Sequence, residues 1–333
     1  MRRFIFNIIS SLAILISISS CVTHKPLEND EQRVKLSIKV SLLDRVAVTR
    51  GEATADELMK NLRVILFREN GILEYNDLIV FGTSTEISDV ISIDVIPNET
   101  KRLYLLANAQ GLLDLNTESG LESRINSCVV SGDMPMPLPI SGVHTIEIGN
   151  TDVEIAQPLF LTRVANKFTF NVKNSTSAAI NLTKVEINKV ADRTYLMPRI
   201  NQNDWLNMMI TELGKDEDRD EQDHAWITDY DLPSGTTHST KSISLSSSIA
   251  SNATRTLDPI YVHESKYIPS GSEQSYTISL TIDGMVYVAK LPILESLVRN
   301  THVKVDVEYL GTKVVLVFDV VPFDKINNSL VFE

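Results

Sequence analysis

The sequence predicts a mainly β protein built from two β-sandwiches in series. Short alternations of apolar and polar residues recur along most of the chain, and a period of two is that of a half-buried strand. Few stretches show the 3.6-residue period of an amphipathic helix, and none of them is long. The hydrophobic fraction of 43% is sufficient for a buried core, and the length of the chain suits about two domains.

The first twenty residues have the composition of an export signal. Arg2 and Arg3 precede an apolar run at residues 4–18, and small residues follow before Cys21. The run is shorter than the roughly 20 apolar residues of a membrane-spanning helix, and Ser and Asn interrupt it. The segment Ile18–Cys21 (ISSC) resembles a bacterial lipobox, which implies cleavage before Cys21 and acylation of this cysteine. An uncleaved anchor or a plain signal peptide is the alternative.

The charge and the cysteine content argue against two classes of protein. Asp and Glu outnumber Lys and Arg by 43 to 31, so nucleic acid is not expected as a partner. Cys128 is the only cysteine besides Cys21, and it has no intrachain partner if Cys21 carries lipid. We therefore expect core burial, and not disulfides, to hold the fold, with Cys128 as a small buried residue.

The clearest strand follows the polar tether at residues 22–33. Residues 34–42 alternate apolar and polar side chains without a break, which predicts one half-buried strand. Its buried face is expected to carry Val34, Leu36, Ile38, Val40 and Leu42. The polar residues 44–52 then predict an exposed loop that contains two arginines.

Other alternating or apolar segments predict further strands in two blocks that meet near residues 157 and 158. The N-terminal block has candidates at residues 57–67, 90–96, 101–109, 145–148 and 153–155. Residues 112–125 are expected to hold a helix or two short turns. The proline-dense residues 134–139 predict a loop, because proline cannot donate to a sheet ladder. The C-terminal block has candidates at residues 167–172, 180–187, 259–263, 275–282, 285–291, 302–309 and 313–321.

Residues 199–258 form the least regular region and include the acidic run at residues 216–223. The alternate aspartates from Asp216 have the spacing of a calcium loop. However, Glu221 stands where a glycine is required, and Ile227 stands where a glutamate is required. A solvated acidic loop is therefore favoured, and whether it binds an ion is left open. No local pattern of a zinc site, a phosphate-binding loop or nucleophilic catalysis is present, so we expect no catalytic residue, cofactor or metal.

Six segments gain meaning from their order and spacing. In the N-terminal half they are LRVILF at residues 62–67, followed by Asn70-Gly71, and RLYLLAN at residues 102–108. In the C-terminal half they are FLTRVANK at 160–167, IYVHES at 260–265, VRNTH at 298–302 and VVPF at 320–323. Together they resemble the fimbrillin family, the lipoprotein-derived pilins of Bacteroidales type V pili. This chain departs from the family pattern at three positions: it has Ser265 in place of Asn, Val303 in place of Tyr and Phe323 in place of Trp. These departures weaken the assignment to one type of subunit more than the resemblance to the family.

The resemblance implies two tandem β-sandwich domains of the transthyretin-like type in a non-enzymatic fimbrial subunit at the surface of the outer membrane. The expected parts are a lipoprotein signal peptide (1–20), a tether with a removable first strand (21–50), and domains at 51–157 and 158–333. In this family a trypsin-like protease cuts after an arginine and removes the first strand, and the groove accepts the C-terminal strand of a neighbouring subunit. Here the matching cut lies between Arg50 and Gly51, with Arg45-Val46 as the second choice.

The donor strand would be the tail at residues 324–333, which spans about 33 Å when extended. Ile326, Leu330 and Phe332 share one face of it, and Asn328 interrupts that face. The partners implied are other fimbrial subunits, identical or paralogous, the membrane through the lipid on Cys21, and the maturation protease. Two alternatives remain. One is an anchor or tip subunit that keeps its lipid, and the other is a ligand-binding surface lipoprotein using Trp205, Trp226, Tyr230 and the acidic loop.

Overall fold

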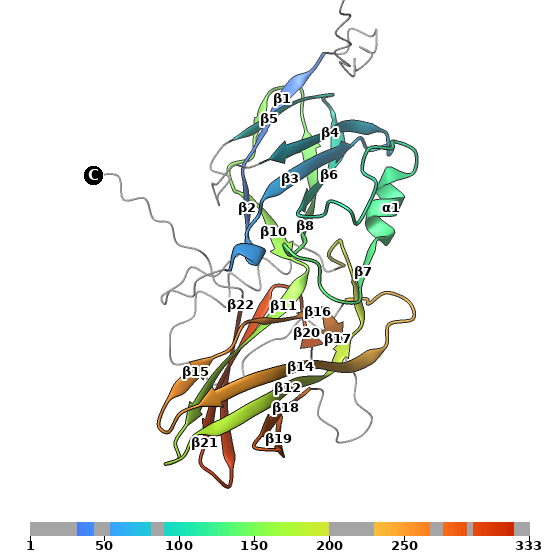
Figure 1. Ribbon diagram of the computed structural model, residues 1–333. Helices are drawn as coiled ribbons and strands as arrows, with labels where there is room; N and C mark the ends of the chain where they lie inside the picture. The colour runs from blue at the N-terminus through green and yellow to red at the C-terminus, as the bar shows by residue number, and fades with distance from the viewer. Residues whose placement is uncertain are drawn as a thin grey trace, which may run out of the picture. The chain divides into compact units, whose positions relative to one another are not determined.

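The structure is mainly β, as the sequence predicts (Figure 1). This computed structural model describes residues 32–42, 54–80, 90–199, 230–266, 276–291 and 296–322. In these ranges the only helical elements are α1 (Leu121–Ser127) and a single 3-10 turn at Ala55–Glu57. None of the helices described there has the length and apolar character needed to cross a membrane.

Two sheets form the N-terminal part. The first has the order β5 (Ile91–Val95), β1 (Val34–Ile38), β9 (Val153–Glu154). The second has the order β2 (Val40–Leu42), β10 (Leu159–Arg163), β8 (Ile140–Ile148), β6 (Glu99–Ala107), β3 (Asn61–Phe67), β4 (Leu73–Val80). The apolar side chains between these sheets form one core, so this part is a β-sandwich.

The central strands β3 and β6 are apolar runs because both of their faces are covered. Leu103 and Leu105 of β6 enter the core between the two sheets. Tyr104 and Leu106 point the other way, into a second core that includes Leu121 and Ile125 of α1. Since successive strand residues face opposite sides, a strand buried on both faces reads as continuous apolar sequence.

The predicted helix or turns at residues 112–125 correspond to α1, which begins only after Gly120. Gly120 has φ = 66°, a conformation that glycine adopts without steric cost. The loop predicted at residues 134–139 is confirmed, since no strand lies there. Cys128 is half-buried rather than fully buried, and burial raises the pKa of its thiol.

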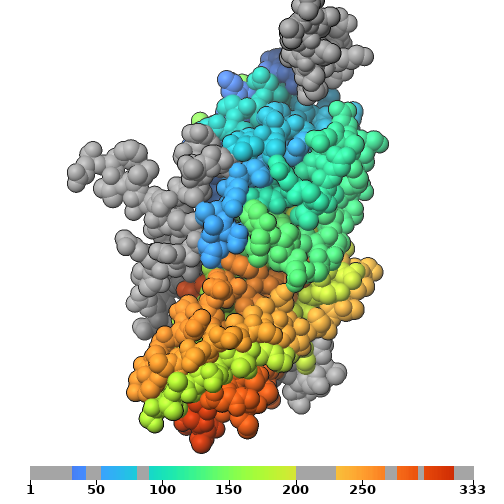
Figure 2. Space-filling view, in the orientation of Figure 1, coloured from blue at the N-terminus to red at the C-terminus, as the bar shows by residue number. Residues whose placement is uncertain are grey.

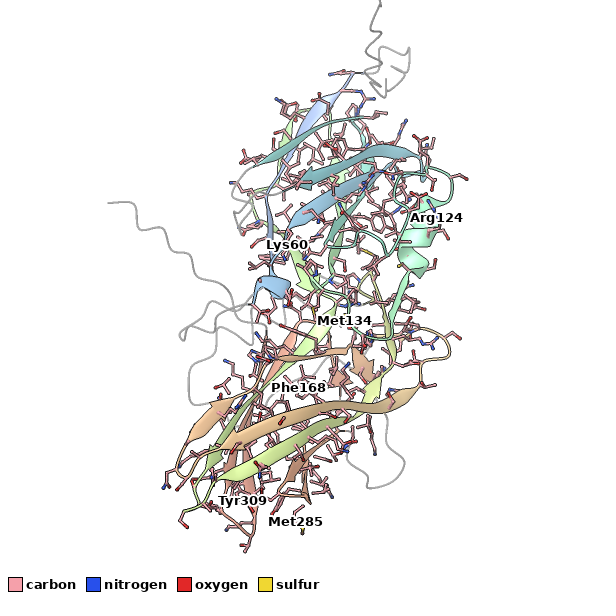
Figure 3. All side chains as sticks on the ribbon, in the orientation of Figure 1. Lys60, Arg124, Met134, Phe168, Met285 and Tyr309 are labelled. Atoms are coloured by element: carbon pink, nitrogen blue, oxygen red, sulfur yellow. The ribbon has the colours of Figure 1, made fainter. Side chains whose placement is uncertain are left out.

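Two further sheets form the C-terminal sandwich. One consists of β11 (Ala165–Asn174) next to β21 (Thr301–Tyr309) and β22 (Val314–Pro322), with β15 (Thr254–Thr256) and β16 (Ile260–His263) on the other side of β11. The other has the order β14 (His238–Ile249), β12 (Ile180–Ala191), β18 (Thr277–Ile282), β19 (Met285–Lys290). Figure 3 shows side chains filling the space between these strands, with Phe168 labelled among them.

The expectation of an irregular region at residues 199–258 is wrong for residues 254–256, which form β15, and most clearly for residues 238–249. These residues form β14, an edge strand twelve residues long that is coloured orange at the surface of the molecule in Figure 2. Ile243 and Leu245 lie on the inner face of β14, and serines alternate with them on the outer face. Serine is not a characteristic strand former. The high content of Ser and Thr therefore concealed a regular strand.

Two short ladders lie outside the four sandwich sheets, and the first of them joins a segment of the N-terminal part to one of the C-terminal part. β7 (Val129–Ser131) pairs with β13 (Arg193–Tyr195), and β17 (Ser265–Lys266) pairs with β20 (Ser296–Leu297). β10 pairs with β8 and β2, whereas β11 pairs with β21 and β16, so the chain changes sheets at Val164. The division into domains near residues 157 and 158 stays a prediction.

Candidate functional site

The candidate site is the place that the first segment, β1 and β2, occupies in the N-terminal sandwich. β1 is the central strand of its sheet: Leu36 lies opposite Ile93 of the antiparallel β5 and opposite Val153 of the parallel β9. β2 runs parallel to β10 at the edge of the other sheet. The prediction of one unbroken strand at residues 34–42 is therefore wrong in one respect, because the segment passes from one sheet to the other at Lys39.

The apolar side chains of this segment all face the core. The exposed fraction is 5% for Val34, 0% for Leu36 and Ile38, and 3% for Val40, while Leu42 is half-buried against the same core. Their neighbours in this core come from β3, β5, β6, β8 and β10 and include Leu62, Val64, Ile91, Ile93, Leu103, Leu105, Ile146 and Leu161. The first segment thus fills a groove that is lined with fully buried apolar side chains. These side chains come from every other strand of this sandwich except the short β9 and the edge strand β4.

A buried cluster of charges lies at the Arg33 end of the groove. The side chain of Lys101 is fully buried, and its ammonium contacts Glu74 Oε2 at 2.5 Å and also the carboxylate of Glu99. Burial alone would raise the pKa of Glu99, but hydrogen bonds from Arg68 and Lys101 outweigh this effect and lower it. Arg33 lies 4.0 Å from Glu74 and remains half exposed, so the cluster keeps its internal pairs without Arg33.

The chain just downstream of residues 43–53 is held by buried polar contacts. Oε1 of Glu57 contacts Nζ of Lys167 at 2.6 Å and accepts a hydrogen bond from the hydroxyl of Tyr261 at 2.5 Å. Nε of Arg163 donates to the carbonyl oxygen of Glu57 at 3.1 Å. Because Glu57 is buried, these contacts fix the chain to the C-terminal strands on one side of the proposed cut.

His144 lies on β8, next to β10, which is the strand that pairs with β2. Its Nε2 is 3.0 Å from the carbonyl oxygen of Phe160 in β10. Burial lowers the pKa of His144 to about 4, although the contact with this carbonyl acts in the opposite direction. The imidazole is therefore neutral at neutral pH, and Nε2 donates its proton to Phe160.

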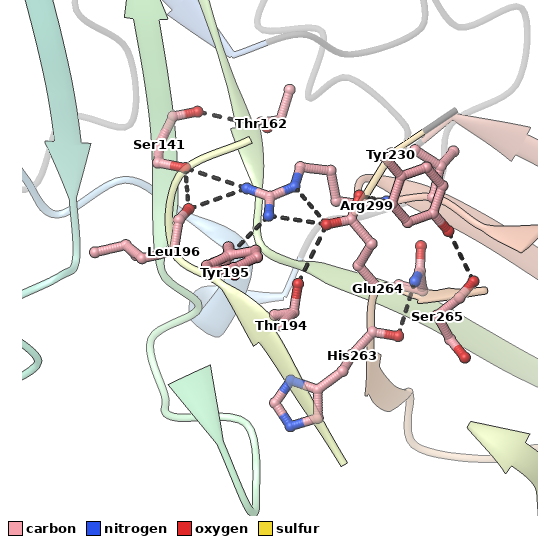
Figure 4. Close-up of polar contacts among 12 residues, drawn as sticks. Ser141, Thr162, Thr194, Tyr195, Leu196, Tyr230, His263, Glu264, Ser265 and Arg299 are labelled. Atoms are coloured by element: carbon pink, nitrogen blue, oxygen red, sulfur yellow. Dashed lines mark hydrogen bonds and ion pairs between the residues drawn. The ribbon is translucent and has the colours of Figure 1, made fainter. Parts of the chain in front are cut away.

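Several segments of the fimbrillin-like pattern meet in a buried polar network that the sequence analysis missed (Figure 4). Nη2 of Arg299 lies 3.0 Å from Oε2 of Glu264, and both side chains are almost fully buried. Arg299 also donates to the carbonyl oxygens of Tyr195 (2.7 Å) and Leu196 (3.0 Å). Thr194 donates to the same oxygen of Glu264 at 3.2 Å. This is a fully partnered ion pair, as burial of charge requires.

Neighbouring motif residues extend this network along the strands. Asn300 accepts from the backbone N–H of Arg163 at 3.1 Å. Asn166 donates to the carbonyl oxygens of His263 (3.2 Å) and Leu297 (2.9 Å). The available sequence signal was the isolated charged and amide residues inside otherwise apolar strands, since such residues are buried only with partners.

The other predicted site residues lie outside the described residues. These are Cys21, Arg50, Gly51, Ile326, Leu330, Phe332, Trp205, Trp226 and the acidic run at 216–223. Tyr230 is described, and the expectation that it faces a ligand is wrong: it is 4% exposed and its hydroxyl donates to the carbonyl oxygen of Ser265 at 2.8 Å. Within the described ranges no group of three or more His, Cys, Asp or Glu side chains is placed to hold a metal ion.

Comparison with known proteins found likeness in structure alone. No protein-family model matches the sequence, and no curated protein matches it. The tip fimbrial protein Mfa3 from Porphyromonas gingivalis matches with a TM-score of 0.57 and 14% identity over 88% of this chain and 100% of its own. The fimbrilin FimA from P. gingivalis W83 matches with a TM-score of 0.51 and 14% identity over 88% of this chain and 98% of its own.

A protein of Parabacteroides distasonis ATCC 8503 assigned to cell adhesion matches with a TM-score of 0.54 and 13% identity. This match covers 89% of the present chain and 98% of that protein. The likeness thus extends over both sandwiches and not over one of them alone. The fimbrillin-like fold that the sequence motifs imply is therefore confirmed for this chain.

Proposed function

We propose that the protein is a structural, non-enzymatic subunit of a cell-surface fimbria that assembles after a protease removes its first strand. The observation that carries this proposal is the central position of β1 between β5 and β9. A central strand cannot leave without an effect on both neighbours. A replacement strand would restore both ladders at once.

The energetics of the groove favour such a replacement. Burial of a large apolar side chain contributes about 1.5–3 kcal/mol, so the first segment contributes on the order of 10 kcal/mol as an upper bound. Its removal would expose the apolar floor of the groove and the unpaired backbone groups of β5 and β9. Sheet edges of this kind bind strands from other chains.

The proposed cut between Arg50 and Gly51 lies between two points of attachment. Upstream, β2 ends at Leu42 in the six-stranded sheet. Downstream, Glu57 is bound by Lys167 and Tyr261. Cleavage between these points would separate the first segment from the rest of the chain and leave the new N-terminus attached to the C-terminal strands.

Cleavage is tested by N-terminal sequencing of the subunits in surface filaments. We expect them to begin at Gly51, and we expect Arg50→Ala to block or displace the cut. Arg45→Ala is the matched control, because this arginine lies in the same segment and is only the second choice. Filament subunits that begin at Cys21 would contradict this maturation step.

Lipidation of Cys21 brings the precursor to the outer membrane in this proposal. We expect Cys21→Ala to abolish metabolic labelling with palmitate and to leave the precursor unprocessed. Unchanged labelling in this variant would contradict the lipoprotein assignment. The controls are the unaltered chain and Cys128→Ala, since the half-buried Cys128 is the only other thiol.

The tail is the proposed donor strand. Deletion of residues 326–333 is expected to leave a folded, trimmed monomer that does not elongate. Replacement of Ile326, Leu330 and Phe332 by Asp should act in the same way, since an unpaired charge in an apolar groove is strongly unfavourable. Filaments of normal length from the shortened chain would exclude the tail as the donor.

A fimbrial anchor or tip subunit that keeps its lipid is the second candidate. The observation that favours it is the complete integration of β1, which is buried and paired on both sides and needs no replacement in the intact chain. Retention of Cys21 and β1 in surface-extracted complexes would support this role over that of a stalk subunit.

A further inference from the structure

We infer that the groove of this chain is selective for a strand from a different protein and discriminates against its own tail. The inference rests on the strand replacement described under the proposed function and adds the identity of the partner. The argument compares the four buried positions of the first segment with the sequence of the tail.

The groove provides four places in a row for apolar side chains. They are occupied by Val34, Leu36, Ile38 and Val40, each at most 5% exposed. Leu36 faces Ile93 and Val153 across the two ladders, and Ile38 faces Ile91. A fifth place, that of Leu42, is only half-buried and therefore contributes less to selection.

The tail cannot fill these four places with apolar side chains. Its apolar face consists of Ile326, Leu330 and Phe332, and Asn328 lies between the first two. With Ile326 in the place of Val34, the amide of Asn328 takes the place of Leu36. A shift of two residues toward β2 moves Asn328 to the place of Ile38 and also puts Asp324 in the place of Val34.

The opposite shift is no better. With Asn328 in the place of Val34, Leu330 and Phe332 take the places of Leu36 and Ile38, but the amide of Asn328 is then buried in the first place of the groove. A shift by one residue would turn the polar face of the tail inward. Each of these registers therefore buries a polar side chain in the groove.

This defect weakens binding. A buried amide without partners loses its hydrogen bonds to water. The expected penalty corresponds to an affinity about ten- to a hundredfold lower than that of a donor with four apolar residues in alternate positions. The partner is therefore a subunit whose donor strand carries this uninterrupted alternation.

The test uses the chain that still carries its first segment, with a site for a specific protease placed between Leu42 and Thr54. After cleavage and release of the first segment in mild denaturant, fluorescent peptides are titrated onto the trimmed chain. The peptides are residues 32–42, residues 324–333, and residues 324–333 with Asn328→Leu. We expect the first and third to bind, and the native tail to bind at least about tenfold more weakly than the third. Equal binding of the native tail and its Asn328→Leu form would overturn the inference.

A second measurement separates this inference from the proposed function. If residues 32–42 do not bind the trimmed chain, strand replacement itself fails. Selectivity of the groove is then read from intact chains in which residues 34–40 are replaced by the sequence of residues 326–332. In this chimera the asparagine of the tail stands at position 36. We expect its melting temperature to lie well below that of a second chimera that differs only in keeping Leu36. Equal melting temperatures would overturn the inference independently of any exchange.

Discussion

The groove of the first segment and the buried network around Arg299 place different demands on the sequence. The groove is filled by apolar side chains whose positions alternate along one short segment. The network depends on Arg299, Glu264 and the carbonyl oxygens of Tyr195 and Leu196, which are distant in the chain. Apolar contacts are non-directional, so many strands of the right period could fill the groove. A buried ion pair has directional partners and tolerates few replacements.

This difference suits the two regions to different roles. A site that exchanges one strand for another needs specificity from period and volume and not from a fixed set of partners. A buried network that has to stay intact when the first strand is lost needs contacts that do not involve this strand. Among the described residues, the pair of Arg299 and Glu264 meets this requirement, because its contacts with Thr194, Tyr195 and Leu196 do not involve β1 or β2.

The largest effect is expected from Glu264→Ala. The substitution leaves the guanidinium of Arg299 buried without its counter-ion, and breaking a buried pair in this way costs about 3–5 kcal/mol of the free energy of unfolding. Chemical denaturation measures this loss. The matched control is the double variant Glu264→Leu, Arg299→Met, in which both charges are absent and the loss should be smaller. An equal loss in the two proteins would show that lost packing, and not the orphaned charge, is responsible.

Substitutions on the first segment, which fills the groove, should have the second-largest effect on the free energy of unfolding. Leu36→Ala removes a fully buried side chain and leaves a cavity, which corresponds to a loss of about 2–5 kcal/mol in the free energy of unfolding. Leu42→Ala is the matched control on the same segment, and its effect should be clearly smaller because Leu42 is half-buried. If the two variants lose the same stability, the burial gradient along the first segment does not determine its contribution.

Most of the fold was predictable because it follows from strand period and apolar runs. β1, β3, β5 and β6 were found in this way, whereas β4 was missed. β4 is an edge strand with almost every residue half-buried, so its side chains have no clear inner and outer face to create an alternation. Edge strands of this kind carry a weak sequence signal.

The polar network was beyond prediction for a different reason. Arg299 and Glu264 are separated by 35 residues and Arg299 and Leu196 by 103, so no local pattern records their contact. The motif segments that contain Glu264 and Arg299 were recognised, but only as strand-like sequence. The passage of the first segment between two sheets at Lys39 was hidden too, since the alternation continues through that residue.

The stability of the N-terminal sandwich, which contains the groove, should also depend on pH. Burial lowers the pKa of His144 to about 4, below its ordinary value of 6.5, so the unfolded chain binds more protons between these two values. Stability is therefore expected to fall as the pH is lowered from about 6.5 to about 4, by at most about 3.5 kcal/mol for this residue. His144→Gln should flatten part of the slope in denaturation curves recorded across this range.

His263 accounts for a second share of this slope, because burial lowers its pKa as well. The single variant His144→Gln should therefore leave some dependence, and the addition of His263→Gln should reduce it further. The share of His144 belongs to the groove side, since its imidazole contacts Phe160 of the strand that pairs with β2. An unchanged slope in His144→Gln would contradict the assignment of a neutral, buried imidazole.

The smallest effect is expected from Arg33→Gln at the open end of the groove. The side chain of Arg33 is 45% exposed, and it reaches Glu74 only at 4.0 Å, whereas Lys101 contacts the same carboxylate at 2.5 Å and is fully buried. An exposed pair of this kind contributes at most about 1 kcal/mol and is screened by salt. Denaturation of the variant and of the unaltered chain should therefore differ slightly at low ionic strength and converge in 1 M salt. Lys101→Met is the matched contrast: it leaves Glu74 and Glu99 buried beside each other with Arg68 as the main remaining cation, and its loss should persist in salt. A loss from Arg33→Gln as large as that from Lys101→Met would mean that the charge at the groove entrance, and not the apolar register, holds the first strand in place.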